Sequence, residues 1–428
     1  MNPDPDANGG DRAPLRRNAA FQRLFWAGIA SQCGSTVATL AITYLVFTTT
    51  GSALAVAYVA LAATLGTLVF ALPMGVFADR HDRRRLLIVA DVVRAVALGF
   101  LAADVALFGL NLAAVVAVTF AVAIPTTLFT PAEQGLVPVL VSPGRLSDAN
   151  GLLRASREIV GFVASALGGA LILLIGAVAA IASNSVTFLV SAALISLVTV
   201  PARLDRALAS EPTPPGMVRE IREGMGWLRR SPGLLALAVS AGPMNFFASI
   251  PGTFLVIYTT VALHGSALTF GAMVGLLTAG SALGALLVGR TGAAAHAGKA
   301  WVIAYGIAGG LMLIVLGIAP RIEVALPAAF AFGVASAYAG NAWLTAAQRV
   351  VPGPIQGRYF AVDNILSNGV VPIAQLAGAF LVVAFGVAAT FTLSGIGLAG
   401  VGALAIASGP LWRFGASVPT HPHPPVEP

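Results

Sequence analysis

Long apolar runs recur along the whole chain, and short polar loops separate them. A run of about 18 apolar residues or more can cross the hydrocarbon core of a bilayer as a helix. Two of the divisions, at Gly176 and Gly386, rest only on a short glycine-containing break. The pattern predicts an all-α membrane protein with twelve transmembrane helices, at about residues 21–47, 54–77, 86–108, 112–131, 153–175, 178–200, 233–260, 268–289, 300–319, 322–345, 360–384 and 387–410.

The composition favours the same class of protein. Of 428 residues, 57% are hydrophobic and only 10% are charged, whereas soluble domains carry about 25% charged residues. The net charge of +7 comes from arginines dispersed among short loops rather than gathered on one polar face. This dispersal argues against binding to nucleic acid. The single cysteine, Cys33, excludes an internal disulfide.

The distribution of Lys and Arg predicts the orientation in the membrane. If the N-terminus is cytoplasmic, 22 of the 24 Lys and Arg residues fall in cytoplasmic segments, and outside there is only Arg321. Positively charged short loops stay on the cytoplasmic side, and an even number of helices returns the C-terminus to that side. The polar stretch Met1–Asn18 lacks the apolar region of a signal peptide, so the first helix is expected to be uncleaved.

One long hydrophilic interval divides six predicted helices from six. Its first part is Pro-rich and its second part places four apolar side chains on one helical face, which predicts an amphipathic helix lying on the membrane surface. These side chains are Val218, Ile221, Met225 and Leu228. The expected domains are a bundle at 1–200, a cytoplasmic linker with this helix at 201–232, a second bundle at 233–410 and a disordered tail at 411–428.

The two halves repeat each other at an offset of 214 residues. Gly51–Leu54 coincides with Gly265–Leu268, and the pattern Ala132-x-Gln-x-x-Val-Pro138 coincides with Ala346-x-Gln-x-x-Val-Pro352. Two such matches at one offset indicate an internal duplication. Six-helix halves in parallel repeat are typical of secondary transporters whose halves rock about a site near the middle of the membrane.

The charged loop between the second and third predicted helices carries a motif. The sequence Gly75-Val-Phe-Ala-Asp-Arg-His-Asp-Arg-Arg84 resembles the signature Gly-x-x-x-Asp-Arg-x-Gly-Arg-Arg of the major facilitator superfamily. Gly75, Asp79, Arg80, Arg83 and Arg84 fit this signature, and Asp82 replaces the usual glycine. Further matches resemble the branch that holds enterobactin exporters and macrolide efflux proteins, namely Pro131-Ala-x-Gln134 with Val137-Pro138, Asp148-Ala-Asn150 and Gly357-Arg358.

The resemblance implies a gate at this loop. Asp79 would contact the start of the eleventh helix, near residues 358–363, and latch the outward-open state. Gly75 is expected to permit a close approach of two helices, and Arg83 to hold a neighbouring acid. The alternative is that these arginines only set the topology. The antiporter motif of the fifth helix is incomplete, because Ala164-Ser165 replace its Gly-Pro ahead of Gly168-Gly169.

Ionisable residues inside the predicted helices are candidates for coupling or gating. Asp91 and Arg94 are three residues apart on one helix face and are expected to pair. The other candidates are Glu133, Glu158 and Asp363. They are interpreted either as ion pairs that hold the cytoplasmic gate or as proton carriers. Among proton carriers, Glu133, which has no cation within one helical turn, and Glu158 are preferred.

A polar stripe predicts the substrate path. Ser31, Ser35 and Thr39 recur every four residues, and the 214-residue offset places Asn245, Ser249 and Thr253 on the matching stripe of the seventh helix. The resemblance implies that the first, fourth, seventh and tenth helices line the cavity. Small polar residues also serve in helix packing, which is the alternative interpretation. Further predicted lining residues are Thr126, Thr130, Tyr338, Asn341 and Gln375.

These observations predict a secondary exporter in the bacterial cytoplasmic membrane. It is expected to be monomeric, to need no cofactor or metal, and to move a hydrophobic or amphipathic small molecule, such as a drug, siderophore or secondary metabolite, in exchange for protons. No Walker motif is present, so ATP is not its own energy source. The alternatives are an importer or facilitator of a small solute and, in a different class, a lipid scramblase or membrane-embedded enzyme.

Overall fold

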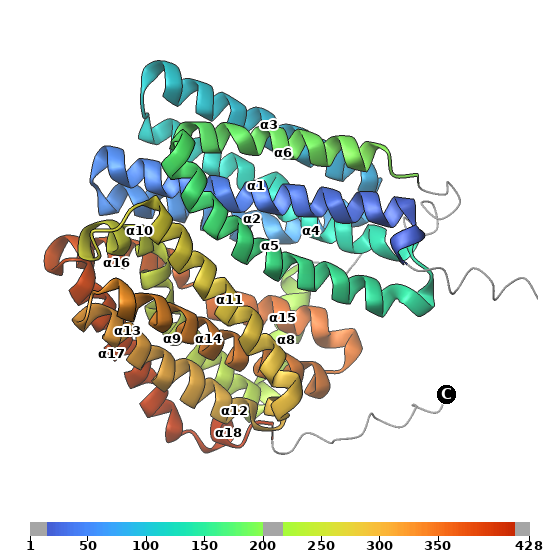
Figure 1. Ribbon diagram of the computed structural model, residues 1–428. Helices are drawn as coiled ribbons and strands as arrows, with labels where there is room; N and C mark the ends of the chain where they lie inside the picture. Colours follow the sequence, from blue (N-terminus) through green and yellow to red (C-terminus); the bar gives the residue numbers. More distant parts are fainter. Residues whose placement is uncertain (1–14, 200–216, 416–428) are drawn as a thin grey trace, which may run out of the picture. The chain divides into compact units, whose positions relative to one another are not determined.

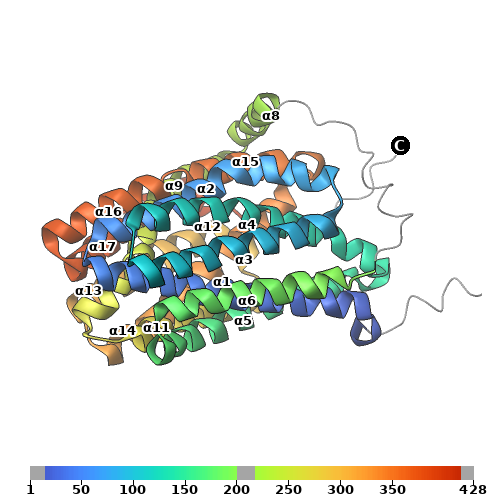
Figure 2. The same cartoon turned by 90° about the horizontal axis from the view of Figure 1, so that it is seen from above.

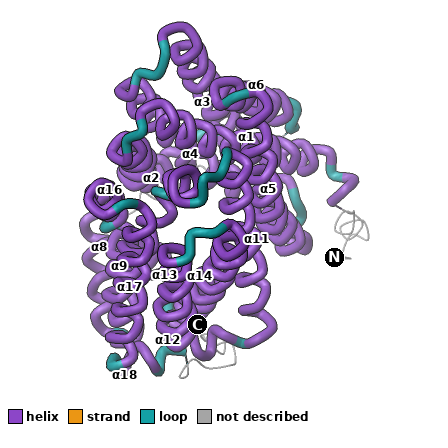
Figure 3. Tube along the Cα trace, turned by 60° about the vertical axis from the view of Figure 1, so that its left-hand side comes forward, coloured by secondary structure: helices purple, strands orange, loops and turns teal. Residues whose placement is uncertain are grey.

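A computed structural model describes residues 15–199 and 217–415. Within these residues, twelve helices are long and apolar enough to cross a membrane, and helices joined by short loops make up the structure (Figure 3). This result confirms the predicted all-α fold with twelve spans. The chain divides into two compact units, of which one comprises Met1–Thr213 and Thr259–Gly275 and the other comprises Pro214–Tyr258 and Leu276–Pro428.

The first unit contains six long helices (Figure 1). Asn18, Ser52, Asp82 and Asn111 begin four of them, because each side chain accepts a hydrogen bond from a backbone N–H in the first turn. The helices are α1 (Ala19–Thr50), α2 (Ala53–Arg80), α3 (Arg83–Phe108), α4 (Leu112–Leu140), α5 (Leu146–Ile175) and α6 (Ala177–Ser196), with short 3₁₀ turns at Leu15–Arg17 and Pro143–Arg145.

The C-terminal half of the chain, which holds the second unit and residues 259–275 of the first, is less regular. Its ninth span combines a 3₁₀ turn (Ala293–His296), α12 (Ala297–Ala300), a π-helix (Trp301–Ala308) and α13 (Gly309–Ile318). A second π-helix at Tyr258–Ala262 follows α10 (Leu255–Ile257). The remaining helices are α8 (Met217–Arg230), α9 (Pro232–Thr253), α11 (Ala267–Thr291), α14 (Ile322–Val350), α15 (Gly353–Asn368), α16 (Val371–Phe385), α17 (Val387–Ile406) and α18 (Gly409–Trp412).

The two units share a pattern of neighbours. In the first unit α1 packs against α5 and α6, while α3 packs against α4 and α6 (Figure 2). In the second unit α9 likewise packs against α15, α16 and α17, while α13 packs against α14 and α17. Equivalent helices therefore meet equivalent partners, as the 214-residue repeat leads one to expect.

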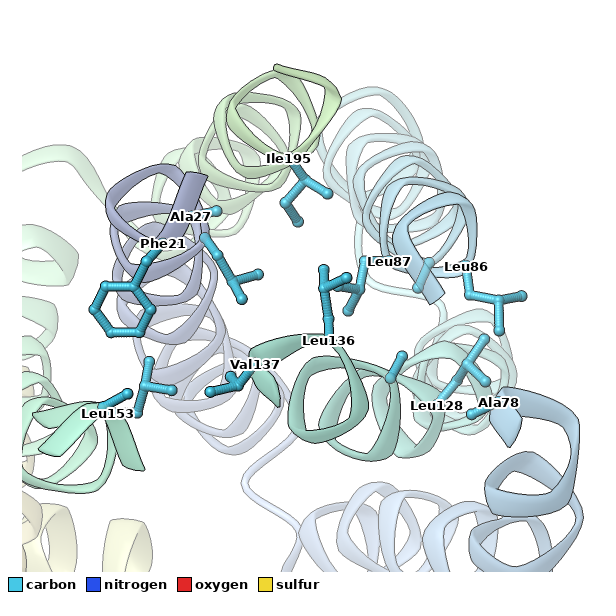
Figure 4. Packing of buried hydrophobic residues seen from close by; sticks show 14 of the residues in the cluster. Phe21, Ala27, Ala78, Leu86, Leu87, Leu128, Leu136, Val137, Leu153 and Ile195 are labelled. Carbon is cyan, nitrogen blue, oxygen red and sulfur yellow. The ribbon is translucent and has the colours of Figure 1, made fainter. Parts of the chain in front are cut away.

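A hydrophobic cluster holds one end of the first unit together (Figure 4). Phe21 of α1, Leu87 of α3, Leu136 of α4 and Ile195 of α6 are each at most 1% exposed. Burying side chains of this size is worth about 1.5–3 kcal/mol each in water, and in a membrane their close packing takes over that role. The cluster lies beside the arginine-rich loop and fixes the helix ends that this loop contacts.

Several helix limits differ from those predicted. Helix α4 extends to Leu140 rather than residue 131, and α5 begins at Leu146 rather than residue 153, because both helices continue as amphipathic segments past their apolar runs. Helix α9 ends at Thr253, soon after Pro251, rather than near residue 260. The eleventh span is broken between Asn368 and Val371, where Pro372 cannot donate a backbone hydrogen bond.

The predicted position of the amphipathic helix on the membrane surface stays a prediction, and the structure adds that this helix also packs against protein. Protein covers the described part of its apolar face, because α8 packs against α15. Leu228 is fully buried, the rings of Trp227 and Tyr359 meet edge to face at 5.9 Å, and Glu223 forms an ion pair with Arg358. The side chains of Val218 and Ile221 lie outside the described residues.

Candidate functional site

The arginines of the charged loop attach it to neighbouring helices. Arg84 donates through Nε to the carbonyl of Ile195 at 3.2 Å and through a second nitrogen to the carbonyl of Ser196. These carbonyls lie at the C-terminal end of α6, where the helix dipole favours a cation. Arg83 donates to the carbonyl of Gly135 in α4 at 2.7 Å. A side chain at position 135 would meet the Arg83 guanidinium, so glycine permits this contact.

Asp82 has a defined role in this loop. Its carboxylate accepts a hydrogen bond from the backbone N–H of Arg85 at 3.0 Å and forms an ion pair with the Arg85 side chain, also at 3.0 Å. It therefore begins α3, and the departure from the family glycine supplies a helix cap. Arg80 is exposed at the end of α2.

Two of the predicted gate residues, Gly75 and Asp79, lie in α2. A Cβ added at Gly75 would meet no atom within 4 Å among the described residues. The expected close approach of another helix at this position stays a prediction. Asp79 lies in the last turn of α2, but its side chain is outside the described part of the structure, and its role as a latch stays a prediction.

Asp91 and Arg94 form the buried ion pair that their spacing predicts. Both side chains in α3 are at most 3% exposed. The Arg94 guanidinium also lies 4.7 Å from the ring centre of Phe129 and 4.3 Å from that of Phe188, so two aromatic faces take the place of water around the cation. The remaining oxygen, Asp91 Oδ2, has no hydrogen-bond partner among the described residues.

Residues of the first unit line a partly open cavity of about 400 Å³. The polar stripe of α1 reaches it, and so do two threonines of α4. All five residues predicted here line the cavity, namely Ser31, Ser35, Thr39, Thr126 and Thr130. Its charged lining residues are Arg94, Glu133 and Arg157.

Glu133, which has no cation within one turn of its own helix, is paired across two helices, as its interpretation as a member of an ion pair requires. Its carboxylate in α4 accepts a hydrogen bond from Arg157 in α5. The Glu133 side chain is 4% exposed and that of Arg157 is 39% exposed. The sequence separation of 24 residues explains why a search within one helical turn misses this cation. Glu158, the next residue on α5, is exposed and does not line either cavity.

Residues of the second unit line a larger, partly open cavity of about 650 Å³. Asn245 and Asn341 line it as predicted. Asn245 also joins three helical segments, because it donates to the carbonyl of Ser367 at 3.0 Å and accepts from the Tyr305 hydroxyl at 2.8 Å. These bonds hold α9, the π-helix and α15 around the cavity.

Asp363 lies on the wall of this second cavity. The residue is 5% exposed, and its Oδ1 atom has no hydrogen-bond partner among the described residues. Ser367, one turn further along α15, lies beside the carboxylate. The expectation that Asp363 belongs to an ion pair is not met, because no Lys, Arg or His of the described residues lines this cavity.

Several predicted lining residues lie elsewhere. Ser249 and Thr253 donate to carbonyls of their own helix, at 3.1 and 3.0 Å, and do not line the cavity. The Tyr338 hydroxyl meets that of Thr291 at 3.1 Å. Gln375 is 5% exposed within α16 and also lies off the cavity wall. The 214-residue offset therefore predicts a lining residue of α9 correctly only at Asn245, the first position of the polar stripe.

Comparison with known proteins identifies the family. A family model described as "Transmembrane secretion effector" matches residues 10–426. The chain belongs to this family of the major facilitator superfamily. It is therefore a multi-pass membrane transporter and not an enzyme.

Similar proteins include efflux transporters. Macrolide efflux protein A of Streptococcus pyogenes is 30% identical over 227 residues, which are 53% of this chain and 55% of that protein. The chain thus matches about half the length of these macrolide efflux proteins. The uncharacterised MFS-type transporter YkuC of Bacillus subtilis is 29% identical over 334 residues, covering 74% of this chain and 75% of that protein.

Solved structures share the fold of this transporter. A nucleoside transporter, NupG, has a TM-score of 0.72 at 10% identity, covering 91% of this chain and 100% of that one. A bacterial homologue of the iron transporter ferroportin has a TM-score of 0.69 at 16% identity, with 95% and 100% coverage. At these identities the likeness concerns the fold alone.

Sequence reasoning missed the aromatic wall of the second cavity. Trp301 and Tyr305 enter it from the π-helix, Trp343 from α14 and Phe360 from α15. Aromatic residues in an apolar run look like lipid-facing or packing residues, and no pattern in the sequence signals a π-helix. The polar residues Asn245 and Asn341 were the predicted lining residues that pointed to this cavity.

Proposed function

We propose that this transporter exports a hydrophobic or amphipathic small molecule in exchange for protons, and that Asp363 carries the proton. The family and the similarity to macrolide efflux proteins support efflux as the direction. The observation that carries the coupling is the buried Asp363 carboxylate, which lines a cavity without a basic partner among the described residues.

A carboxylate in this position suits proton exchange. A buried carboxylate that is paired with a cation stays ionised, whereas one without a partner can be neutralised by a proton. The ionisable groups near Asp363 are Tyr359 on its own helix and Tyr305 across the cavity. A phenol does not neutralise a carboxylate. The charge of Asp363 can therefore be neutralised only by a proton or by a cationic ligand.

The paired acids of the first unit are poorer candidates. Asp91 has Arg94 and Glu133 has Arg157, and neutralising either acid would leave an arginine without its counter-charge. We assign both pairs to the structure of the first cavity and its closure. Glu158 is exposed on α5 and lines neither cavity, so it is also a poorer candidate.

Transport into everted membrane vesicles tests this proposal. Vesicles containing the full chain are expected to accumulate erythromycin or ethidium when their interior is acidified, because everted vesicles turn export into uptake. A gradient of one pH unit corresponds to about 1.4 kcal/mol per proton, or about tenfold accumulation. Nigericin, which collapses the pH gradient, is expected to abolish uptake. Accumulation that survives nigericin would contradict proton coupling.

Two variants and one control sharpen the assay. Asp363→Asn is expected to lose gradient-driven accumulation by more than about tenfold while inserting normally. Glu323→Gln removes an exposed acid in the first turn of α14 of the same unit and should transport like the parent. Asp79→Asn tests the latch, and full transport by that variant would remove the latch from the proposal.

A further inference from the structure

The charge of the second cavity limits what it can hold. Asp363 is the one charged residue on its wall among the described residues. The other polar lining groups are neutral serine hydroxyls and asparagine amides on α9, α11, α14 and α15, together with the Tyr305 hydroxyl. An anionic ligand would meet a fixed negative charge here with no arginine or lysine to offset it, so anions are disfavoured.

Aromatic rings form much of the remaining wall. Trp301 and Tyr305 lie 4.9 Å apart between ring centres, and Trp343 meets Phe360 edge to face at 6.0 Å. The faces of such rings attract cations, and their area also suits an apolar ligand body. Negative charge and aromatic surface are therefore combined in one cavity.

Hydrogen bonds that do not involve Asp363 hold two aromatic side chains of the cavity wall in place. Trp301 donates from Nε1 to the Ser240 hydroxyl at 3.2 Å, and Tyr305 donates to Asn245. These bonds use the polar ends of both aromatic side chains and fix their rings. The Oδ1 atom of Asp363 has no hydrogen-bond partner among the described residues.

We propose that the cavity of the second unit binds a lipophilic monovalent organic cation, with Asp363 as counter-ion and the Trp301, Tyr305, Trp343 and Phe360 side chains around the apolar body of the ligand. A volume of about 650 Å³ is within the usual range for sites that bind drug-sized ligands. A metal ion is disfavoured because one carboxylate does not supply the six or more oxygen ligands of Ca²⁺ or the octahedral set of Mg²⁺.

The proposal names the substrate class of the exporter and in that respect rests on the proposed function. Binding itself needs no gradient, so it can be tested without transport. If the cation binds at Asp363 and vesicles show no driven uptake, the site stands and the export proposal fails. If driven uptake occurs and binding of the cation does not depend on Asp363, the export proposal stands and the proposed binding site is wrong.

Tetraphenylphosphonium and tetraphenylborate are the probes, because they have nearly the same size and shape and opposite charges. Equilibrium dialysis of the purified full chain in neutral-lipid nanodiscs measures saturable binding of each ion. Tetraphenylphosphonium is expected to bind at about one ion per chain, and Asp363→Asn is expected to weaken this binding at least tenfold. Asp363→Glu, which keeps the charge, should recover most of the affinity, and Glu323→Gln should bind like the parent.

A second readout uses the unaltered protein, so that misfolding of a variant cannot decide the result. Dicyclohexylcarbodiimide modifies carboxyl groups in apolar surroundings, and peptide mass spectrometry reports the modification at Asp363. Tetraphenylphosphonium is expected to slow this modification several-fold, and tetraphenylborate is expected not to. Absence of saturable cation binding, equal binding by Asp363→Asn, or no protection at Asp363 would each overturn the proposal.

Discussion

The two units place charge differently around equivalent cavities. The wall of the first holds Arg94, Glu133 and Arg157, with Asp91 directly behind Arg94, so each of its acids has a basic partner. The wall of the second holds only Asp363 among the described residues, without a basic partner. A shared helix arrangement therefore supports one cavity whose charges are internally neutralised and another that is open to a proton or a cationic ligand.

The offset of 214 residues shows how this difference arose at particular positions. Ser31 and Asn245 are equivalent, and each lines its cavity. Asp91 corresponds to Tyr305 and Arg94 to Ala308, so the buried ion pair of the first unit is replaced by a neutral hydrogen bond in the second. Asp363 corresponds to the fully buried Ala149. The repeat keeps the helix packing and varies the charges, which is why fold alone does not identify a coupling residue.

Removing Arg94 should have the largest effect on stability. Arg94→Met leaves the Asp91 carboxylate buried without its cation, and breaking a buried pair in this way costs about 3–5 kcal/mol. The double variant Asp91→Asn with Arg94→Met removes both charges and is expected to recover much of the loss. Unfolding of the purified protein in mixed micelles, followed by tryptophan fluorescence, measures both values.

The second unit provides the contrast for this experiment. Asp363→Asn breaks no ion pair among the described residues, so it should leave the unfolding midpoint close to that of the parent. A loss as large as that of Arg94→Met would show that Asp363 has a structural cation after all, and the distinction between the two cavities would then be lost.

The pair between Glu133 and Arg157 should respond unequally to removal of its two members. Arg157→Met leaves a carboxylate that is 4% exposed without its cation, at a cost of about 1–3 kcal/mol. Glu133→Gln leaves an arginine that is 39% exposed and can turn to water, so the expected cost is below about 1 kcal/mol. Equal losses in the same unfolding assay would mean that both side chains are buried to the same extent in the membrane.

Much of the fold follows from the sequence because the governing interactions are local. The length of an apolar run sets a helix, and the three-residue spacing of Asp91 and Arg94 sets their pairing. The partner of Glu133 could not be found in this way, since Arg157 lies on another helix. Helix packing also decides that Asp363 lines a cavity while Ser249 and Thr253 lie off its wall. A polar stripe predicts which way its side chains face only where the helix is regular. Helix α9 ends at Thr253, so the stripe is less reliable there.

The smallest expected effect on stability concerns the loop between α2 and α3, which differs from the loop that follows α11 in the other half of the chain. The first loop has Asp82 as the cap of α3, whereas the loop after α11 has Gly292 in the left-handed conformation and no acid. Asp82→Ala should cost about 1 kcal/mol of unfolding free energy, and Asp82→Gly, which restores the residue usual in the superfamily, only a few tenths. Transport in everted vesicles should be nearly unchanged in both, because the cap stabilises a helix end and does not line a cavity. If Asp82→Gly instead abolished transport at normal stability, the carboxylate would belong to the gate, and Asp79 would no longer be the distinctive acid of this loop.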